Sequence, residues 1–487
     1  MANLRRSLVI NFLSSSGATV LQFVVSILLA RILSPSEIGV YSMTVVFVNL
    51  AHVFRDFGVT FYLQREPDLT PAKIRSATGV LFTTSWIIAL ALFMASESLG
   101  RWFREPGIVP VMRVLAIGFV FIPFGSITSA LLARNFEAGK QAYVNAVGTI
   151  LFCVSCLTLA KLGFGSMSLA WANLINIIAC GIAYIPLRPK NLPWMPSFTH
   201  WRSVAHFGIG SLLTNCIEAM NISVPDVLLG KLAGAREVGL FSRANSTVTI
   251  FTYVAGSTVS YGAVSYLAQA HHRGDPLSPV LARATTLLTG VGWTALALTA
   301  VLGKDIVQAL YGPTWVDGVP AILPLSIAAA VTMLFHYVPM AVTAIGRPYL
   351  SAIPMAVTLV SCVTFGILLF DGSVRNFAWA LCLASLATAP IVALQQRRYL
   401  HFGAGELLRA VLPSAIVASV TASAALLADA LLPAGMPALA RLLVMALPLA
   451  LVWYAMLRLT HHPLVDEIGR LATPVRNRLS ALMAKAR

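Results

Sequence analysis

Apolar blocks about twenty residues long recur along the whole chain, separated by short polar segments. At a rise of about 1.5 Å per residue, a helix of this length crosses the hydrocarbon core of a bilayer. Of the 487 residues, 58% are hydrophobic and 11% are charged, whereas a soluble domain is about 45–50% apolar and about 25% charged. A water-soluble fold would not bury this much apolar surface, so lipid is the expected solvent.

The length of the blocks separates helices from strands. Only helices and closed barrels span a bilayer, because an unpaired backbone group in hydrocarbon costs several kcal/mol. Barrel strands alternate polar and apolar side chains over about ten residues, and the blocks here do not alternate. The sequence predicts an all-α polytopic membrane protein with fourteen transmembrane helices, at residues 8–30, 38–63, 77–96, 109–132, 141–160, 166–187, 204–230, 238–262, 281–301, 319–344, 349–370, 374–395, 409–430 and 438–459.

The net charge of +16 lies in the short segments between these blocks. On a soluble protein it would suggest nucleic-acid binding, but here the positive-inside rule explains it, so no nucleic-acid partner is expected. The N-terminus, the loops after even-numbered spans and the C-terminal tail hold about twice as many Lys and Arg residues as the opposite loops. This bias predicts that both termini are cytoplasmic.

The junction between the first two spans returns 200 residues later in altered form. The segment "LLARILSPSEIGVYSMT" at 28–44 aligns without a gap with "LLGKLAGAREVGLFSRA" at 228–244. Six predicted spans separate the copies, so both have the same orientation, as in a parallel repeat about the membrane normal. We expect two six-helix lobes with a parallel pseudo-two-fold repeat, plus two extra C-terminal helices. The predicted domains are 1–187 (N-terminal lobe), 188–203 (linker), 204–395 (C-terminal lobe), 396–460 (helices 13 and 14) and 461–487 (basic amphipathic cytoplasmic tail).

Three segments resemble the polysaccharide flippases of the multidrug/oligosaccharidyl-lipid/polysaccharide exporter (MOP) superfamily, of the O-antigen flippase type. They are "LLARILSPSEIGVYSMTVVFVNLAHVFRDFGVTFYLQRE" at 28–66, "DVLLGKLAGAREVGLFSRANS" at 226–246 and "GKDIVQALYGPTWVDGVPAILPLSIAA" at 303–329. The resemblance implies a two-lobe fold in the bacterial inner membrane. It implies alternating access that moves an undecaprenyl-pyrophosphate-linked oligosaccharide repeat unit to the outer leaflet without an ATP site.

Two other function classes stay open at this point. A drug/cation antiporter of the same superfamily is one, although such antiporters usually have twelve spans. A polytopic glycan polymerase or ligase is the other, but it would need a large extracytoplasmic loop, and the predicted loops are short. The chain has no GxxxxGK[ST], HExxH or GxSxG motif. We therefore expect a transporter, not an enzyme, with no cofactor.

No metal site is expected. Cys153 and Cys156 have CxxC spacing, but no second pair or nearby His completes a ligand set. All six cysteines lie within apolar blocks. They are interpreted as small buried hydrophobic residues.

Charged residues inside the apolar blocks indicate the site, because a charge near the bilayer centre costs at least about 2.5–3.5 kcal/mol on insertion scales. The second span carries His52, Arg55 and Asp56. Arg55 is the expected diphosphate contact, since its planar guanidinium binds phosphate oxygens bidentately and stays charged. His52 shares a helix face with Arg55 or with Asp56. The alternative is an Arg55–Asp56 pair at the membrane interface.

The seventh span has a polar face. Asn215, Glu218 and Asn221 recur at three-residue steps, and Pro225 beside Asp226 predicts a kink. We expect Asn215, Glu218 and Asn221 to contact the substrate. Glu218 and Asp226 are the predicted ion-coupling residues, binding a proton or Na⁺, because a buried carboxylate holds a proton more tightly. Structural pairing with a cation on a neighbouring helix is the alternative.

Two further features complete the prediction. Arg243, at the start of the eighth span, is expected either to receive the diphosphate late in the cycle or to cap its helix. The tail has the pattern of a basic amphipathic helix that lies on an anionic membrane surface. Binding of a polysaccharide polymerase is the alternative role of this tail. Its apolar positions are Leu464, Ile468, Leu471, Val475, Leu479 and Leu482.

Overall fold

The computed structural model describes residues 2–189, 196–199, 201–260, 263–433 and 435–470. Within these ranges all regular structure is helical and no strand occurs, so the all-α prediction is confirmed. The chain forms two compact units, Met1–Ser242 (unit 1) and Arg243–Arg487 (unit 2). The boundary falls within a helix, later than the predicted start of the C-terminal lobe at residue 204, and the lobe limits stay a prediction.

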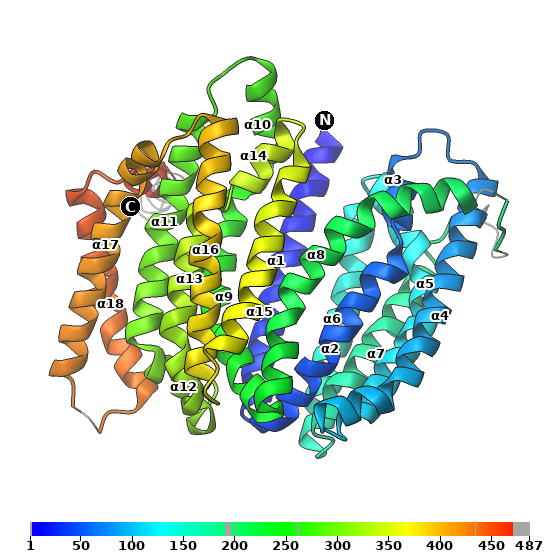
Figure 1. Cartoon of the computed structure of the whole chain (residues 1–487), viewed down its shortest axis with the longest axis horizontal. Helices are drawn as coiled ribbons and strands as arrows, with labels where there is room; N and C mark the ends of the chain where they lie inside the picture. Colours follow the sequence, from blue (N-terminus) through cyan, green and yellow to red (C-terminus); the bar gives the residue numbers. More distant parts are fainter. Residues whose placement is uncertain (1, 190–195, 200, 261–262, 434, 471–487) are drawn as a thin grey trace, which may run out of the picture. The chain divides into compact units, whose positions relative to one another are not determined.

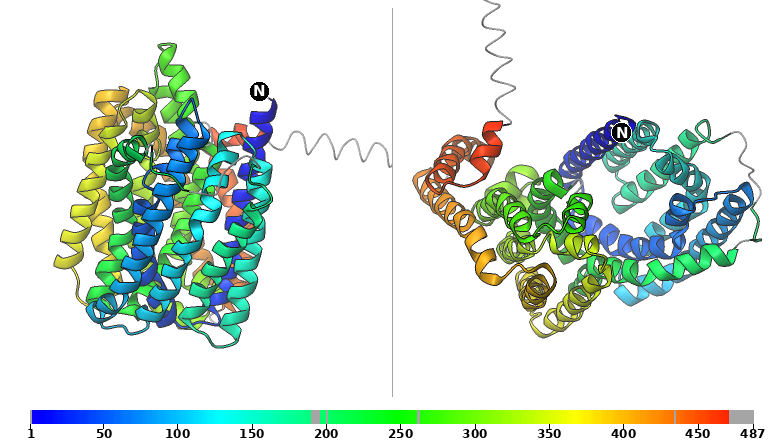
Figure 2. Two further views of the ribbon diagram at one scale, coloured as in Figure 1. Left: turned by 90° about the vertical axis from the view of Figure 1, so that its right-hand side faces the viewer. Right: turned by 90° about the horizontal axis from the view of Figure 1, so that it is seen from above.

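Unit 1 is a bundle whose long helices are seen from the side in Figure 1 and end-on in the right-hand view of Figure 2. α1 runs beside α6, and α5 packs between α4 and α7. The helices are α1 (Ala2–Ala30), α2 (Pro35–Asp56), α3 (Val59–Arg65), α4 (Pro71–Phe103), α5 (Ile108–Arg134), α6 (Ala138–Lys161), α7 (Ser166–Tyr184), α8 (Trp201–Ala233) and the start of α9 (Ala235–Ser260).

Unit 2 holds the rest of α9 and the remaining helices. In it, α11 packs along α17 and α13, and α15 packs along α16. Its elements are α10 (Ala263–His272), α11 (Ser278–Val301), α12 (Gly303–Leu310), the 3₁₀ helix η1 (Pro313–Ala321), α13 (Ile322–Leu334), α14 (Val338–Ala344), the 3₁₀ helix η2 (Pro348–Ser351), α15 (Ala352–Leu368), α16 (Val374–Leu400), α17 (Ala404–Leu431) and α18 (Ala438–Leu459).

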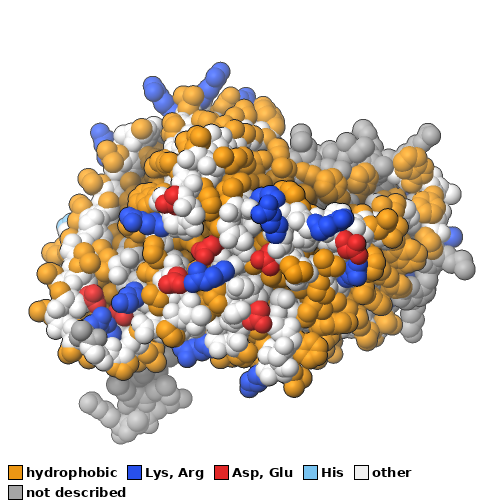
Figure 3. Space-filling model, turned by 60° about the horizontal axis from the view of Figure 1, so that its bottom comes forward, with side chains coloured by type: hydrophobic (Ala, Val, Ile, Leu, Met, Phe, Trp, Pro, Cys, Tyr) orange, Lys and Arg blue, Asp and Glu red, His pale blue; other side chains and the backbone are white. Residues whose placement is uncertain are grey.

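Eleven helical segments of the described chain are long and apolar enough to cross a membrane, and Ser16–Ala30 is a shorter apolar helix. The chain is therefore a multi-pass membrane protein, while the count of fourteen spans stays a prediction. Lys, Arg, Asp and Glu side chains gather on the end of the molecule that Figure 3 brings forward, and hydrophobic side chains cover its flanks. This distribution suits helices whose sides face lipid and whose ends face water.

Two predicted spans are interrupted helices. The span expected at 38–63 divides into α2 and α3, because Phe57 and Gly58 adopt left-handed backbone angles, with φ of 42° and 69°. The span expected at 319–344 divides into α13 and α14. There Pro339 lacks the N–H that a continuous helix would use.

Close packing within unit 1 relies on glycine at helix crossings. A Cβ added at Gly125 of α5 would lie 2.8 Å from Cδ2 of Tyr184 on α7. Gly118, two turns earlier on α5, would similarly place a Cβ 2.8 Å from Cδ1 of Ile177. The two glycines let α7 approach α5 closely enough for their polar residues to share one cavity.

The start of the tail packs on unit 2 itself. Leu464, Val465 and Ile468 contact a cluster that includes the buried Val417 and Leu457. Of the apolar positions assigned from the sequence to a membrane-surface helix, Leu464 is thus buried by protein and Ile468 is partly buried. The positions Leu471, Val475, Leu479 and Leu482 lie outside the described residues.

Candidate functional site

The last turn of α2 carries a partly buried cation. The side chain of Arg55 is 14% exposed, and its Nη1 donates a hydrogen bond to Ser126 Oγ of α5 at 3.2 Å. Its acidic neighbour Asp56 lies 3.9 Å from Nη2 and also accepts a 2.6 Å hydrogen bond from the hydroxyl of Thr60. Thr84 of α4 donates to the Arg55 carbonyl at 3.0 Å, which fixes the end of α2. The α2–α3 break therefore presents Arg55 to α5.

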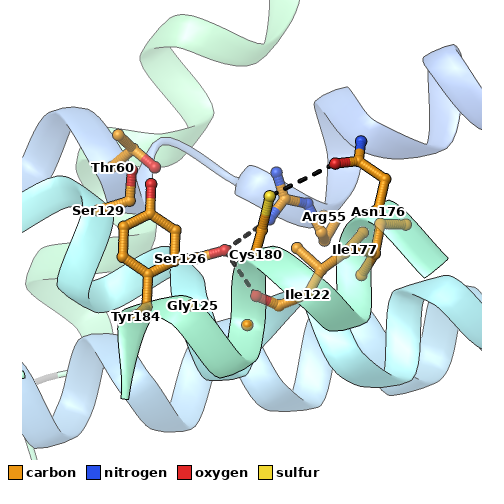
Figure 4. A pocket seen from close by; sticks show the side chains of 11 residues that line it. Arg55, Thr60, Ile122, Gly125, Ser126, Ser129, Asn176, Ile177, Cys180 and Tyr184 are labelled. Carbon is orange, nitrogen blue, oxygen red and sulfur yellow. Dashed lines mark hydrogen bonds between the residues drawn. The ribbon is translucent and has the colours of Figure 1, made fainter. Parts of the chain in front are cut away.

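Arg55 lines a cavity of about 300 Å³ that lies wholly within unit 1. α2, α3, α5 and α7 form its wall, and Figure 4 shows Arg55 with Asn176 and Cys180 at one end and Thr60, Ser129 and Tyr184 at the other. The lining residues are Arg55, Thr60, Ile122, Gly125, Ser126, Ser129, Asn176, Ile177, Cys180, Gly181 and Tyr184. The cavity is thus an open one whose wall carries several polar side chains and a single cation, Arg55.

Asn176 and Cys180 form a fixed pair on the α7 wall. The thiol of Cys180 donates to Asn176 Oδ1 at 3.4 Å, as Figure 4 shows, so the amide nitrogen of Asn176 remains a donor. Gly148 of α6 packs behind them, and a Cβ at that position would overlap both Asn176 Oδ1 and Cys180 Sγ. The glycine therefore gives these two side chains their position in the wall.

The cavity is suited to an anion. Arg55 Nε is buried and has no hydrogen-bond partner in the described part of the chain. A buried unpaired polar group costs about 1–3 kcal/mol, and more when it is charged. No carboxylate belongs to the cavity wall, where Arg55 and Asn176 supply donors. Phosphate oxygens form short, charge-assisted hydrogen bonds with a guanidinium group.

His52 shares the α5-facing side of α2 with Arg55, as its spacing predicts. Its ring lies 4.6 Å from that of Phe119, at an interplanar angle of 31°. It does not belong to the cavity wall. Its contact with Phe119 packs α2 against α5 one turn before Arg55.

The predicted residues of α8 lie outside this cavity. Asn221 donates to the carbonyl of Ile217 in its own helix at 2.9 Å. Glu218 is exposed, Asn215 and Asp226 are half-buried, and neither carboxylate forms an ion pair with another described residue. The helix continues through Pro225 as one element. The structure therefore does not bring these residues together with Arg55.

Arg243 belongs to unit 2, where its guanidinium carbon lies 6.0 Å from the ring centre of Tyr311. Thr247 donates to the hydroxyl of Tyr311 at 3.3 Å. Arg243 is thus held by an aromatic ring of its own unit. Among the described residues no group of three His, Cys, Asp or Glu side chains is placed to hold a metal ion.

Sequence reasoning missed the α5 and α7 walls of the cavity. Ser126 and Ser129 are one helical turn apart, and Asn176, Cys180 and Tyr184 recur at four-residue steps. Each set lies on one face of its helix. A search for polar faces in every apolar block, not only for charges, would have found both.

Comparison with known proteins agrees with this architecture. A family model described as "Polysaccharide biosynthesis protein" matches residues 28–320. Succinoglycan biosynthesis transport protein ExoT of Rhizobium meliloti (strain 1021) is 23% identical over 384 residues, which are 77% of this chain and 76% of that protein. Teichuronic acid biosynthesis protein TuaB of Bacillus subtilis (strain 168) is 21% identical over 391 residues, 77% of this chain and 78% of that protein.

Solved structures share the fold. Lipid II flippase MurJ in an inward closed conformation superposes with a TM-score of 0.76 at 13% identity, covering 94% of this chain and all of that one. An inward-facing multidrug resistance MATE family transporter of the MOP superfamily gives a TM-score of 0.63 at 15% identity, covering 79% of this chain and 94% of that one. The family model covers more than half of the chain, so this membrane protein belongs to the polysaccharide biosynthesis protein family, and its resemblance to the polysaccharide flippases of the MOP superfamily is confirmed.

Proposed function

We propose that this protein is a flippase that moves an undecaprenyl-pyrophosphate-linked oligosaccharide repeat unit across the bacterial inner membrane. The membership of a polysaccharide biosynthesis family supports the class of cargo. The names of relatives as transport proteins, and the likeness to MurJ and MATE, support a transporter and not an enzyme. Membrane lipids surround it, both termini are cytoplasmic, and a polysaccharide polymerase acts next to it on the flipped product.

The partly buried Arg55 is the observation that carries this proposal. An isoprenoid-linked glycan is attached through a diphosphate, the one strongly anionic group of such a cargo. Arg55 lines a cavity of about 300 Å³, and its buried Nε has no hydrogen-bond partner among the described residues. Because Asp56 lies 3.9 Å from Nη2, it offsets only part of the positive charge. Arg55 thus acts as the diphosphate contact, with Asn176 beside it and His52 and Asp56 holding the end of α2.

Transport proceeds by alternating access between two six-helix lobes of a fourteen-span array. The matching segments 28–44 and 228–244 support this repeat, because the glycines of the two copies pack on each other's helix starts. A Cβ at Gly39 would overlap the carbonyl oxygen of Ala235, and one at Gly239 would overlap that of Pro35. Gly39 and Gly239 differ by 200 in residue number, and so do Pro35 and Ala235, so the two contacts are equivalent in the two copies.

Coupling to an ion gradient is assigned to α8. Glu218 and Asp226 are the two carboxylates of α8, neither forms an ion pair with another described residue, and either one takes up the proton or Na⁺. Asn215 and Asn221 supply neutral hydrogen-bonding groups on the same helix. Arg243 receives the diphosphate in unit 2 late in the cycle, replacing its contact with Tyr311.

The test is flipping of a purified lipid-linked oligosaccharide in proteoliposomes. Arg55→Gln is expected to slow flipping by about tenfold or more, since hydrogen bonds to a charged group contribute about 1.5–3 kcal/mol. Arg55→Lys keeps the charge but not the planar fork, so an intermediate rate is expected. Arg397→Gln, which removes an exposed Arg at the end of α16, is the matched control. Equal rates in Arg55→Gln and in the control would refute the role of Arg55.

A drug/cation antiporter is the second candidate, because the MATE transporter shares the fold. Such a protein needs a site for organic cations, whereas the unit 1 cavity holds a cation of its own. Export of ethidium from proteoliposomes, at a rate that Arg55→Gln leaves unchanged, would favour the antiporter.

A further inference from the structure

A second cavity lies in unit 2, at the break between α13 and α14. The break falls inside the segment Pro313–Ala344, which is long and apolar enough to cross a membrane. Pro339 has no N–H, and Phe335 O accepts instead from Val338 N at 3.0 Å, which ends the α-helical pattern. Interrupted backbone at membrane depth is tolerated where it lines a cavity, and broken helices often mark binding sites in transporters.

The cavity has a volume of about 280 Å³, near the lower end of the range of about 300–1,000 Å³ for ligand pockets. Both sides of the helix break contribute to its wall, together with α15 and α16. Its side chains include no Asp, Glu, Lys or Arg. The polar residues of the wall are Thr332, His336, Ser351, Thr358, Ser385, Thr388 and Gln395.

The hydroxyls of this wall are mainly acceptors toward a ligand. Thr332 donates its proton to Ala328 O at 2.8 Å, and Ser385 donates to Leu381 O at 3.1 Å. Thr358 and Thr388 each lie within hydrogen-bond reach of a carbonyl of their own helix, and their oxygens lie 2.9 Å apart, so one hydroxyl of the pair donates to the other. Because the protons are used within the protein, oxygen lone pairs remain on this wall.

Gln395 also presents an acceptor to the cavity. Its Nε2 donates to the carbonyl of Leu350 at 2.9 Å, so Oε1 is the atom left to accept. Phe335 and Met355 add an aromatic ring and an apolar surface to the wall. The cavity therefore combines acceptors for several donors with a flat apolar contact.

This chemistry selects the ligand class. A diphosphate has no donors and would meet no Lys or Arg here, whereas a hydrocarbon tail would fill the apolar part of the wall but make no use of its acceptors. A metal cation would find no carboxylate to balance its charge. A sugar ring has several hydroxyl donors and a C–H face that packs on an aromatic ring. We infer that the unit 2 cavity is a subsite for an uncharged sugar residue of the cargo, which rests on the proposed flippase function.

The two cavities differ in chemistry. The wall of the unit 1 cavity includes Arg55, and the wall of the unit 2 cavity includes hydroxyl and amide acceptors. Protection of cysteines from a thiol reagent tests each cavity separately. Cys180 is the native reporter in unit 1, and Ser385→Cys, in a Cys180→Ala/Cys216→Ala background, is the reporter in unit 2. The other four cysteines are buried.

The probes are inorganic diphosphate and the neutral oligosaccharide released from the lipid by mild acid. The oligosaccharide is expected to slow labelling at position 385 by about two- to tenfold, the range that one neutral hydrogen bond supports, and diphosphate is expected to leave it unchanged. At Cys180, measured in Cys216→Ala, the two probes should have the opposite effects. Absence of oligosaccharide protection at 385, or protection there by Na⁺ or by undecaprenol alone, would overturn the subsite.

A transport measurement separates this inference from the proposed function. Thr388→Val removes a cavity oxygen at nearly constant volume and is expected to slow flipping of the lipid-linked oligosaccharide about two- to tenfold. It should leave flipping of undecaprenyl pyrophosphate without sugar unchanged, whereas Arg55→Gln slows both. Thr421→Val, which removes a buried threonine that bonds its own helix outside the cavity, is the control. Equal slowing of both lipids by Thr388→Val contradicts a sugar subsite.

Discussion

The hydroxyls of Ser42 and Ser242, 200 residues apart in the sequence, lie 3.5 Å from each other. The two serines occupy the same position in the segments 28–44 and 228–244. Around them Gly39 packs on Ala235, and Gly239 packs on Pro35. Matching residues of the two copies thus meet in reciprocal contacts, the arrangement that a local two-fold axis produces.

Gly39→Ala is expected to destabilise this junction. Its Cβ would overlap the carbonyl oxygen of Ala235, so α2 and α9 must separate. Overpacking of this kind costs about 1–3 kcal/mol, and Gly239→Ala should cost a similar amount. The midpoint of thermal unfolding in detergent measures the effect. Gly17→Ala, where a Cβ meets no atom within 4 Å, is the control, and an equal midpoint in all three variants would show that the contact is dispensable.

Gly148→Ala is expected to alter the unit 1 cavity without touching the ligand. The added methyl would overlap Asn176 Oδ1 and Cys180 Sγ, so both side chains must move. Labelling of Cys180 by a thiol reagent should change in rate, and protection by inorganic diphosphate should weaken about two- to tenfold if Asn176 donates one hydrogen bond to it. Gly139→Ala, on the same helix with open space around the new Cβ, should behave as the parent protein.

Ser126→Ala tests how Arg55 is held. The substitution removes the 3.2 Å hydrogen bond that Nη1 donates, while Asp56 stays 3.9 Å away as the remaining contact. The guanidinium then loses one of the contacts that hold it in place. The rate of flipping is therefore expected to fall about two- to tenfold, less than in Arg55→Gln. A proteoliposome assay compares the two. A larger loss in Ser126→Ala than in Arg55→Gln would place the serine itself on the substrate.

Glu218→Gln and Asp226→Asn test ion coupling. Each variant removes a titratable group at nearly constant shape, so a carboxylate that binds the driving ion should lose its gradient dependence. We expect flipping driven by a proton or Na⁺ gradient to fall to the rate seen without a gradient in one of the two variants. Gradient-dependent flipping that persists in both single variants and in the double variant would remove α8 from the coupling mechanism.

His462, just after α18, gives unit 2 a defined pH dependence. It is 1% exposed, its Nδ1 accepts from Leu464 N at 3.2 Å, and its Nε2 lies 3.0 Å from Ser414 Oγ. Burial lowers its pKa from 6.5 to about 4. The unfolded chain therefore binds the proton first, and the stability that neutral His462 contributes is lost as pH falls from about 6.5 to about 4.

The midpoint of thermal unfolding, measured across this pH range, checks the expectation. His462→Gln offers an acceptor and a donor that do not titrate, so its midpoint should fall less steeply with acid. Glu467, paired with Arg283 at 2.8 Å in the same region, is present in both proteins, so its contribution cancels in the comparison. Parallel curves for the two proteins would assign the pH dependence to other groups.

The sequence was sufficient to predict that lipid is the solvent, that the spans are helices, and which family the chain belongs to. Helical spans follow from the length of apolar blocks, because each block must satisfy its own backbone hydrogen bonds in lipid. Arg55 was found for the same local reason, since one charge in an apolar block is conspicuous wherever the helix packs. The match of 28–44 with 228–244 was also visible in the linear chain.

Only the tertiary structure decided which residues share a cavity. Ser126 and Asn176 carry no charge and lie in separate apolar blocks, so their positions around Arg55 depend on how closely α5, α6 and α7 approach at Gly125 and Gly148. The same holds for Leu464 and Ile468, whose pattern suits lipid and protein equally. Hydrophobic periodicity predicts which face of a helix is shielded from water. Which neighbour covers that face depends on packing between segments that are distant in the chain.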